Sequence, residues 1–230
     1  MQNVAVSQTQ VSESGFISKV YLWMSLGLIV SAGASVFMLS QPELLKAVFT
    51  NRMIFFGLII AEVGLVIWLS AAAMRLSATA ALALFLAYSF LNGVTLCSIF
   101  LVYTGGSIAT TFAVTAGTFF FFSVYGLTTK KDLTGIGGLA MMGLIGVIIA
   151  SVVNIFLKSS GLMWVMTFAG IAVFLALIAY DTQKLKAMHA MAAHDEEMSK
   201  KVAVLGALAL YLDFINLFLL LLRIFGKGRK

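Results

Sequence analysis

Residues 202–224 read VAVLGALALYLDFINLFLLLLRI and contain two charged side chains, Asp213 and Arg223. An α-helix of about 20 residues crosses the hydrocarbon core of a bilayer, which is about 30 Å thick. The apolar residues of this stretch do not alternate with polar ones, as they would in a strand of a membrane barrel. The stretch therefore predicts a transmembrane α-helix.

The rest of the chain has the same apolar character. Apolar residues make up 61% of the 230 residues and charged residues 10%, against about 25% charged residues in a typical soluble domain. Six further apolar runs have the length of a membrane span: 17–39, 53–73, 77–100, 108–127, 133–157 and 162–184. The seven runs predict an all-α polytopic membrane protein, folded as a seven-transmembrane-helix bundle.

The predicted spans form one transmembrane domain, residues 17–225, between a polar N-terminal tail (1–16) and a short basic C-terminal tail (226–230). The single cysteine, Cys97, excludes an internal disulfide, and its apolar surroundings favour a buried, inert thiol. The net charge of +6 comes from basic residues near the helix ends. It is therefore a signal for membrane orientation, and no nucleic-acid partner is expected.

The distribution of lysine and arginine predicts that residues 1–16 lie in the cytoplasm. In that orientation eight basic residues fall on the cytoplasmic side: Lys19, Arg75, Lys130, Lys131, Lys184, Lys186, Lys200 and Lys201. The opposite loops hold three: Lys46, Arg52 and Lys158. Cytoplasmic loops are enriched in such residues. The basic C-terminal tail does not fit this distribution. Seven full crossings place it outside the cytoplasm, whereas a re-entrant last segment would place it inside. We expect seven crossings, since the last run is long enough to span.

Ionisable residues inside the spans are the candidates for function. They are Glu62, Asp181, Asp213 and Arg223. Such a group at the centre of a bilayer costs about 2.5–3.5 kcal/mol on insertion scales, so these side chains are expected to face the bundle interior. For Arg223 two interpretations remain open: an ion pair with Glu62, or a side chain that extends to the membrane interface.

Asp181 and Asp213 are predicted to form a pair. They lie on consecutive spans joined by a cytoplasmic loop, so both belong to the half of the membrane nearer the cytosol. Two carboxyls in a low dielectric share a proton and titrate as a unit. The pattern predicts a pH switch, and Arg75 is a nearby cation that would bias it.

The loop between these two spans, residues 185–201, contains His189 and His194 beside several acids. Their spacing matches no metal-binding motif, so a solvated, charged loop is expected there.

The segment from Leu208 to Phe218, followed by LLRIFG at 221–226, closely resembles the last helix of Bax inhibitor family proteins. Other stretches agree in order and spacing: Glu62-Val63 with Met74-Arg75, Asn92 to Leu96, Lys130 to Leu133, and Tyr180-Asp181. The resemblance covers the second to seventh spans and is greatest to bacterial members. Some relatives have a proline after the Thr95-Leu96 step, where this chain has Cys97-Ser98, so a less kinked helix is expected.

The resemblance implies a bundle with the last helix central and a pH-dependent calcium leak in a bacterial inner membrane. Asp181 and Asp213 would be the proton-sharing pair and would bind calcium transiently, and Arg75 would be the cation beside them. Glu62 and Arg223 would form a second ion pair that bridges two helices. No cofactor is implied.

Three functions compete for this sequence. A proton-gated leak of calcium leads, because hard carboxylate oxygens suit that ion; its partners would be the lipid bilayer, calcium and protons. The second is a regulatory protein that binds a membrane protease or another membrane protein, through residues 1–15. The third is an intramembrane aspartyl protease. Asp213 lacks the glycine-rich approach of those enzymes and the chain has no Pro-Ala-Leu motif, so no catalytic residues are expected.

Overall fold

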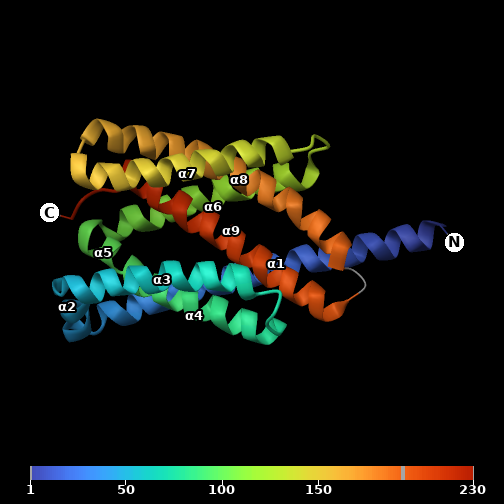
Figure 1. Cartoon of the computed structure of the whole chain (residues 1–230), viewed down its shortest axis with the longest axis horizontal. Coiled ribbons are helices and arrows are strands. Elements are labelled where there is room, and N and C mark those ends of the chain that lie inside the picture. The colour runs from blue at the N-terminus through green and yellow to red at the C-terminus, as the bar shows by residue number, and fades with distance from the viewer. Residues whose placement is uncertain (1, 193–194, 230) are drawn as a thin grey trace. The chain divides into compact units, whose positions relative to one another are not determined.

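The structure is a computed structural model that describes residues 2–192 and 195–229, with side chains described from residue 14 onward except at 191. These residues form nine α-helices (Figure 1). The helices are α1 (Gln2–Leu39), α2 (Pro42–Thr50), α3 (Arg52–Ala72), α4 (Ala78–Leu96), α5 (Ser98–Val102), α6 (Gly105–Thr128), α7 (Thr134–Leu157), α8 (Ser160–Ala192) and α9 (Glu196–Phe225).

Seven helical stretches among the described residues are long and apolar enough to cross a membrane. They are Ser14–Leu39, Arg52–Ala72, Ala78–Val102, Gly105–Thr128, Thr134–Leu157, Ser160–Ala190 and Glu196–Phe225. The prediction of an all-α polytopic membrane protein is thereby confirmed. The last span is the most enclosed, with 67% of its apolar window buried against 6% in α7, which fits the central position expected for it.

The helices extend beyond the predicted spans at two places. Helix α1 begins at Gln2, so residues 2–16, expected as a polar tail, are helical. The predicted loop 185–201 is mostly helical as well, because α8 continues to Ala192 and α9 begins at Glu196. Hydropathy marks where a helix leaves the bilayer, whereas polar helix formers such as lysine and glutamate let it continue into water.

The described chain divides into two compact units. The first contains residues 2–102 and 187–211, and the second contains residues 103–186 and 212–229. Helices α8 and α9 each contribute to both units, since each is one continuous helix. Tyr211 and Asp213, two residues apart on α9, therefore belong to different units.

In the first unit, α1 packs most extensively on α4. Gly93 allows this approach, because a Cβ at that position would collide with the backbone of Ser31 on α1. A core cluster of Ala34, Met38, Val94 and Cys97 lies between the two helices. Cys97 is fully buried and free, as predicted. The start of α4 is tied to α9, because the Ala78 N–H donates to Glu197 Oε1 at 2.7 Å.

Whether the third span is less kinked than in relatives with proline stays a prediction. The span has a local irregularity at Cys97, between α4 and α5, although Cys97 keeps a helical conformation and its N–H donates to the Gly93 carbonyl at 3.1 Å. Beside it, Thr95 Oγ1 lies 2.9 Å from the Asn92 carbonyl oxygen, and Ser98 Oγ donates to the Thr95 carbonyl at 2.8 Å. Such local bonds compete with the helical ladder for carbonyl oxygens and bend helices.

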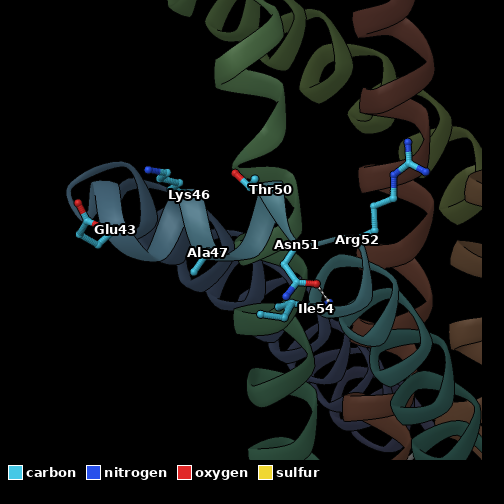
Figure 2. A pocket seen from close by; sticks show the side chains of 7 residues that line it. All are labelled: Glu43, Lys46, Ala47, Thr50, Asn51, Arg52 and Ile54. Atoms are coloured by element: carbon cyan, nitrogen blue, oxygen red, sulfur yellow. Dashed lines mark hydrogen bonds between the residues drawn. The ribbon is translucent and has the colours of Figure 1, made fainter.

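Helix α2 is too short to span and was not predicted. Its apolar residues Leu45, Val48 and Phe49 pack against the core cluster of the first unit. Its polar side and the start of α3 line an open pocket of about 610 Å³, formed by Glu43, Lys46, Ala47, Thr50, Asn51, Arg52 and Ile54 (Figure 2). Asn51 Oδ1 accepts the Met53 N–H at 3.0 Å and so caps α3. The amphipathic pattern is typical of a helix at a membrane interface.

In the second unit, glycines bring α8 close to its neighbours. A Cβ at Gly126 of α6 would collide with the Ala179 carbonyl of α8, and one at Gly137 of α7 would collide with the Tyr180 ring. Helices α7 and α8 accordingly run side by side (Figure 1). Small residues at such contacts replace the hydrophobic driving force that lipid removes.

The link between α6 and α7 is fixed to α8 by Gln183. Its side chain accepts the Leu133 N–H at 2.9 Å and donates to the Lys131 carbonyl at 2.8 Å. Hydrogen bonds from the hydroxyl and the backbone N–H of Thr134 lower the pKa of Asp132 in the same link. This Asp132 cap therefore stabilises the start of α7 at neutral pH and is lost as the pH falls through the lowered pKa.

Gln183→Ala is expected to destabilise the protein by about 1–2 kcal/mol, because two hydrogen bonds are lost and water replaces part of them. The melting temperature in lipid nanodiscs measures the change. Gln183→Glu still accepts from Leu133 but sets a carboxylate oxygen against the Lys131 carbonyl, so it should destabilise the protein at least as much as Gln183→Ala. Equal melting temperatures for wild type and Gln183→Ala would contradict the assigned role.

The C-terminal tail lies beside the link between α5 and α6. The Thr104 N–H donates to the Lys227 carbonyl at 3.0 Å, and Tyr103 forms a β-bridge with Gly228. The third and seventh spans therefore end on the same side, as alternating full crossings require. A re-entrant last segment would place the tail on the opposite side, so the structure favours seven crossings.

Candidate functional site

Asp181 of α8 and Asp213 of α9 form the centre of the candidate site. Both lie in the second unit, and their carboxyl groups lie close enough to interact with each other. Asp213 is buried, with 5% of its surface exposed, while Asp181 is partly exposed. Two carboxylates held together in a low dielectric repel each other, so such a pair favours a state that keeps at least one proton.

Close helix contacts hold the two acids in place. Asp181 lies between Ala179 and Thr182, the residues of α8 against which Gly126 packs. On α9, Phe214 follows Asp213, and its ring meets the Phe119 ring of α6 with 5.5 Å between centroids. Both aspartates thus sit on well-packed backbone, where small changes in helix position alter the distance between the carboxyls.

Some buried polar atoms of the second unit have no hydrogen-bond partner among the described residues. Asp213 Oδ2 is buried, and no described residue forms a hydrogen bond with it. The same holds within the described chain for the buried hydroxyls of Thr182 and Ser123. The second carboxyl oxygen of Asp213 is thus left available to a proton, water or a cation.

Lys184 is the cation that the structure places near the pair. It lies three residues after Asp181 on α8 and acts on its carboxyl electrostatically. Its Nζ is 5.8 Å from the centroid of the Tyr180 ring. The sequence analysis used Lys184 only for orientation, although an i, i+3 spacing from Asp181 on a helix was a usable signal.

The structure does not test the roles predicted for the other charged residues. Arg75 is exposed in the turn after α3, in the first unit, so its place beside the pair stays a prediction. Glu62 belongs to the first unit and Arg223 to the second, and their ion pair also stays a prediction. Within its own unit Arg223 donates to Thr167 Oγ1 at 3.0 Å.

Glu62 is a buried acid of α3, with 9% of its surface exposed. Its carboxyl accepts a hydrogen bond from Thr95 Oγ1 at 2.8 Å and one from Asn92 Nδ2 at 3.4 Å. These α4 partners were quoted from the sequence as part of a motif, but their contact with Glu62 was not predicted.

No group of three or more metal-ligating side chains is found in the described part of residues 185–201. The expectation of a solvated loop is wrong at His189, which lies on α8, is buried, and stacks on Phe16 of α1 with 4.8 Å between ring centroids. His194 lies outside the described residues.

These features define a class, an integral membrane protein with seven helical spans and a pair of carboxyls inside its last two helices. The family described as "Inhibitor of apoptosis-promoting Bax1" matches residues 13–230. The chain belongs to this Bax inhibitor family, which confirms the resemblance seen in its sequence.

Three curated relatives illustrate the similarity, and all three are bacterial proteins. The chain is 49% identical over 226 residues to "Inner membrane protein YbhL" of Escherichia coli (strain K12), covering 98% of this chain and 97% of that protein. It is 48% identical to an uncharacterized protein of Borreliella burgdorferi, covering 94% of this chain and 93% of the other. It is 42% identical to an uncharacterized protein of Rickettsia prowazekii, covering 93% and 90%.

Proposed function

We propose that this protein is a proton-gated calcium leak of a bacterial inner membrane, gated by Asp181 and Asp213. The proximity of the two carboxyls supports this proposal, because two carboxyls so placed in a low dielectric keep at least one proton between them. The inner-membrane location rests on the name of the Escherichia coli relative.

The proton controls the contact between α8 and α9 at this point. Loss of the shared proton leaves two negative charges that repel each other in a low dielectric. The same two carboxylates offer a hard divalent cation oxygen ligands of the kind it prefers. No cluster of three or more metal-ligating side chains occurs in the described residues. Two carboxylates bind calcium weakly. Weak binding is needed here, because a conducted ion must also leave its site.

Calcium flux into liposomes tests the proposal. Wild type is expected to leak calcium at a rate that changes between about pH 6 and about pH 8, where a buried acid pair titrates. Asp213→Asn and Asp181→Asn each remove one titrating carboxyl and keep the shape of the side chain. Each variant should therefore give a flux that hardly changes with pH.

Glu43→Gln is the matched control, since Glu43 is an exposed acid on α2. It should keep the wild-type pH response. Wild-type pH dependence in both aspartate variants would refute the gate, and a wild type that leaks no calcium at any pH would refute the function.

A further inference from the structure

A chain of buried and partly buried hydrogen bonds crosses the first unit from α3 to α1. Asn92 Nδ2 contacts Glu62 Oε2 at 3.4 Å, and Asn92 Oδ1 accepts from the Tyr211 hydroxyl at 2.9 Å. The Tyr211 hydroxyl in turn lies 2.6 Å from Ser31 Oγ, a pair in which either oxygen can donate. Four helices, α3, α4, α9 and α1, contribute one side chain each.

The orientation of the Asn92 amide sets the direction of this chain. With Nδ2 facing Glu62, the amide donates to the carboxylate, and its oxygen must receive the proton of Tyr211. Tyr211 then accepts from Ser31. Every hydroxyl and N–H points towards Glu62, and Thr95 Oγ1 adds a further donor at 2.8 Å. This is the arrangement that an ionised Glu62 needs, because a carboxylate only accepts.

The same side chains also satisfy a protonated Glu62. Its hydroxyl then donates to Asn92 Oδ1 once the amide has turned over, and Asn92 Nδ2 donates to the Tyr211 oxygen. Tyr211 donates to Ser31, which passes its own proton to a backbone carbonyl. Two carbonyls lie within reach of Ser31 Oγ: Ser89 O at 2.7 Å and Gly27 O at 3.0 Å. No group of the chain loses its partner in either arrangement.

We propose that Glu62 is a second proton-binding site of this protein, and that Asn92 and Tyr211 report its charge to α9 by reversing the hydrogen-bond chain. The proton comes from water and binds a carboxyl oxygen of Glu62. Each later link only reorients the hydrogen that it already carries.

The surroundings suit a single acid that gains and loses a proton. The titratable groups that face Glu62 from the neighbouring helices of its unit are the phenols of Tyr88 on α4 and Tyr211 on α9. Within the described residues of the first unit no cation forms an ion pair with Glu62. Within the first unit, the donors of Asn92 and Thr95 stabilise its charge, and the ion pair with Arg223 of the second unit stays a prediction.

The link has a consequence for gating, and only this consequence rests on the proposed function. Tyr211 lies two residues before Asp213 on the same helix. Reversal of the chain changes which group the Tyr211 hydroxyl donates to. Protonation of Glu62 therefore changes the hydrogen bonds that join α1 and α4 to α9, the helix that carries Asp213.

A double-mutant cycle between Glu62 and Ser31 tests the chain, because these residues are joined only through Asn92 and Tyr211. Melting temperatures of the full chain in lipid nanodiscs are compared at about pH 5 and about pH 8, on either side of the usual range of a perturbed carboxyl. Ser31→Ala should change the effect of Glu62→Gln by about 2 °C or more, as members of one hydrogen-bond network do.

Ser35→Ala is the matched control. Ser35 lies one turn further on α1, is as buried as Ser31, and donates to the Gly93 carbonyl of α4 at 2.6 Å, outside the chain. Its effect should add to that of Glu62→Gln within about 1 °C. Equal coupling of both serines to Glu62, or coupling of neither, would overturn the proposal.

Infrared difference spectra provide a second measurement if Glu62→Gln does not fold. With Glu62 intact, Ser31→Ala should shift the carboxyl band that appears on acidification, and Ser35→Ala should leave it in place; no shift in either variant also overturns the proposal. Neither measurement involves calcium. A coupled chain in a protein without a leak would therefore refute the proposed function alone, and a leak without coupling would refute the chain alone.

Discussion

Gly93→Ala is expected to lower the melting temperature by about 5 °C or more, because the new methyl group has no room between α4 and α1. Its Cβ would collide with the Ser31 carbonyl oxygen and lie 2.8 Å from Ala34 Cβ. Backbone atoms cannot turn aside as a flexible side chain does, so the two helices must separate. The separation also breaks the contact between Ser31 and Tyr211, and the coupling between Glu62 and Ser31 should vanish with it.

Gly33→Ala is the control for this change. Gly33 is an exposed glycine of α1 with open space where a Cβ would be. Alanine is a better helix former than glycine by about 1 kcal/mol, so this variant should melt slightly higher than wild type. Thermal melts in nanodiscs would distinguish the two substitutions, because one should lower the melting temperature and the other should raise it. A stable Gly93→Ala would mean that α1 and α4 are not in close contact.

Gly126→Ala is expected to lower the melting temperature by a similar amount, about 5 °C, and to weaken the pH response of the calcium leak. A Cβ on Gly126 would collide with the Ala179 carbonyl and lie 3.1 Å from Thr182 Cβ. Asp181 lies between these two residues of α8. Displacement of that helix segment changes the distance between the carboxyls of Asp181 and Asp213, so the shared proton is held less well.

The matched substitution on the same helix is Gly117→Ala, at an exposed position with no atom within 4 Å of the new Cβ. It should keep the wild-type pH response and gain slightly in stability. Liposome flux at several pH values, with a melt of each variant, separates loss of fold from loss of gating. A wild-type response in a destabilised Gly126→Ala would show that the α6–α8 contact does not position the pair.

The seven spans were predictable because length and hydropathy alone decide whether a helix can cross a bilayer. Their ends were less predictable. Lysine and glutamate stop a membrane span but not a helix, and so α8 and α9 extend into the predicted loop 185–201. The irregularity at Cys97 was not predicted, because the sequence contains no proline there; the hydroxyls of Thr95 and Ser98 contact helix carbonyls beside it.

The charged residues of the site were predictable because a charge in lipid is energetically costly. That cost singled out Asp213 and Glu62, and chain direction brought Asp181 to the same half of the membrane. The partners of Glu62 were not predictable in the same way. Asn92 and Tyr211 are uncharged, and which faces of α4 and α9 meet depends on packing at glycines such as Gly93. Asn216, three residues after Asp213 on α9, donates to the Leu212 carbonyl of its own helix.

The two ends of α9 are both tied to backbone outside the helix. Near its start, Glu197 holds the first amide of α4, and beyond its end Lys227 accepts from the amide of Thr104. Movement of α9 along its axis would break at least one of these hydrogen bonds. Rotation about the axis can change the distance between Asp213 and Asp181 while the helix stays at the same depth, so we expect repulsion at the pair to act as a torque on α9 rather than as a push along it.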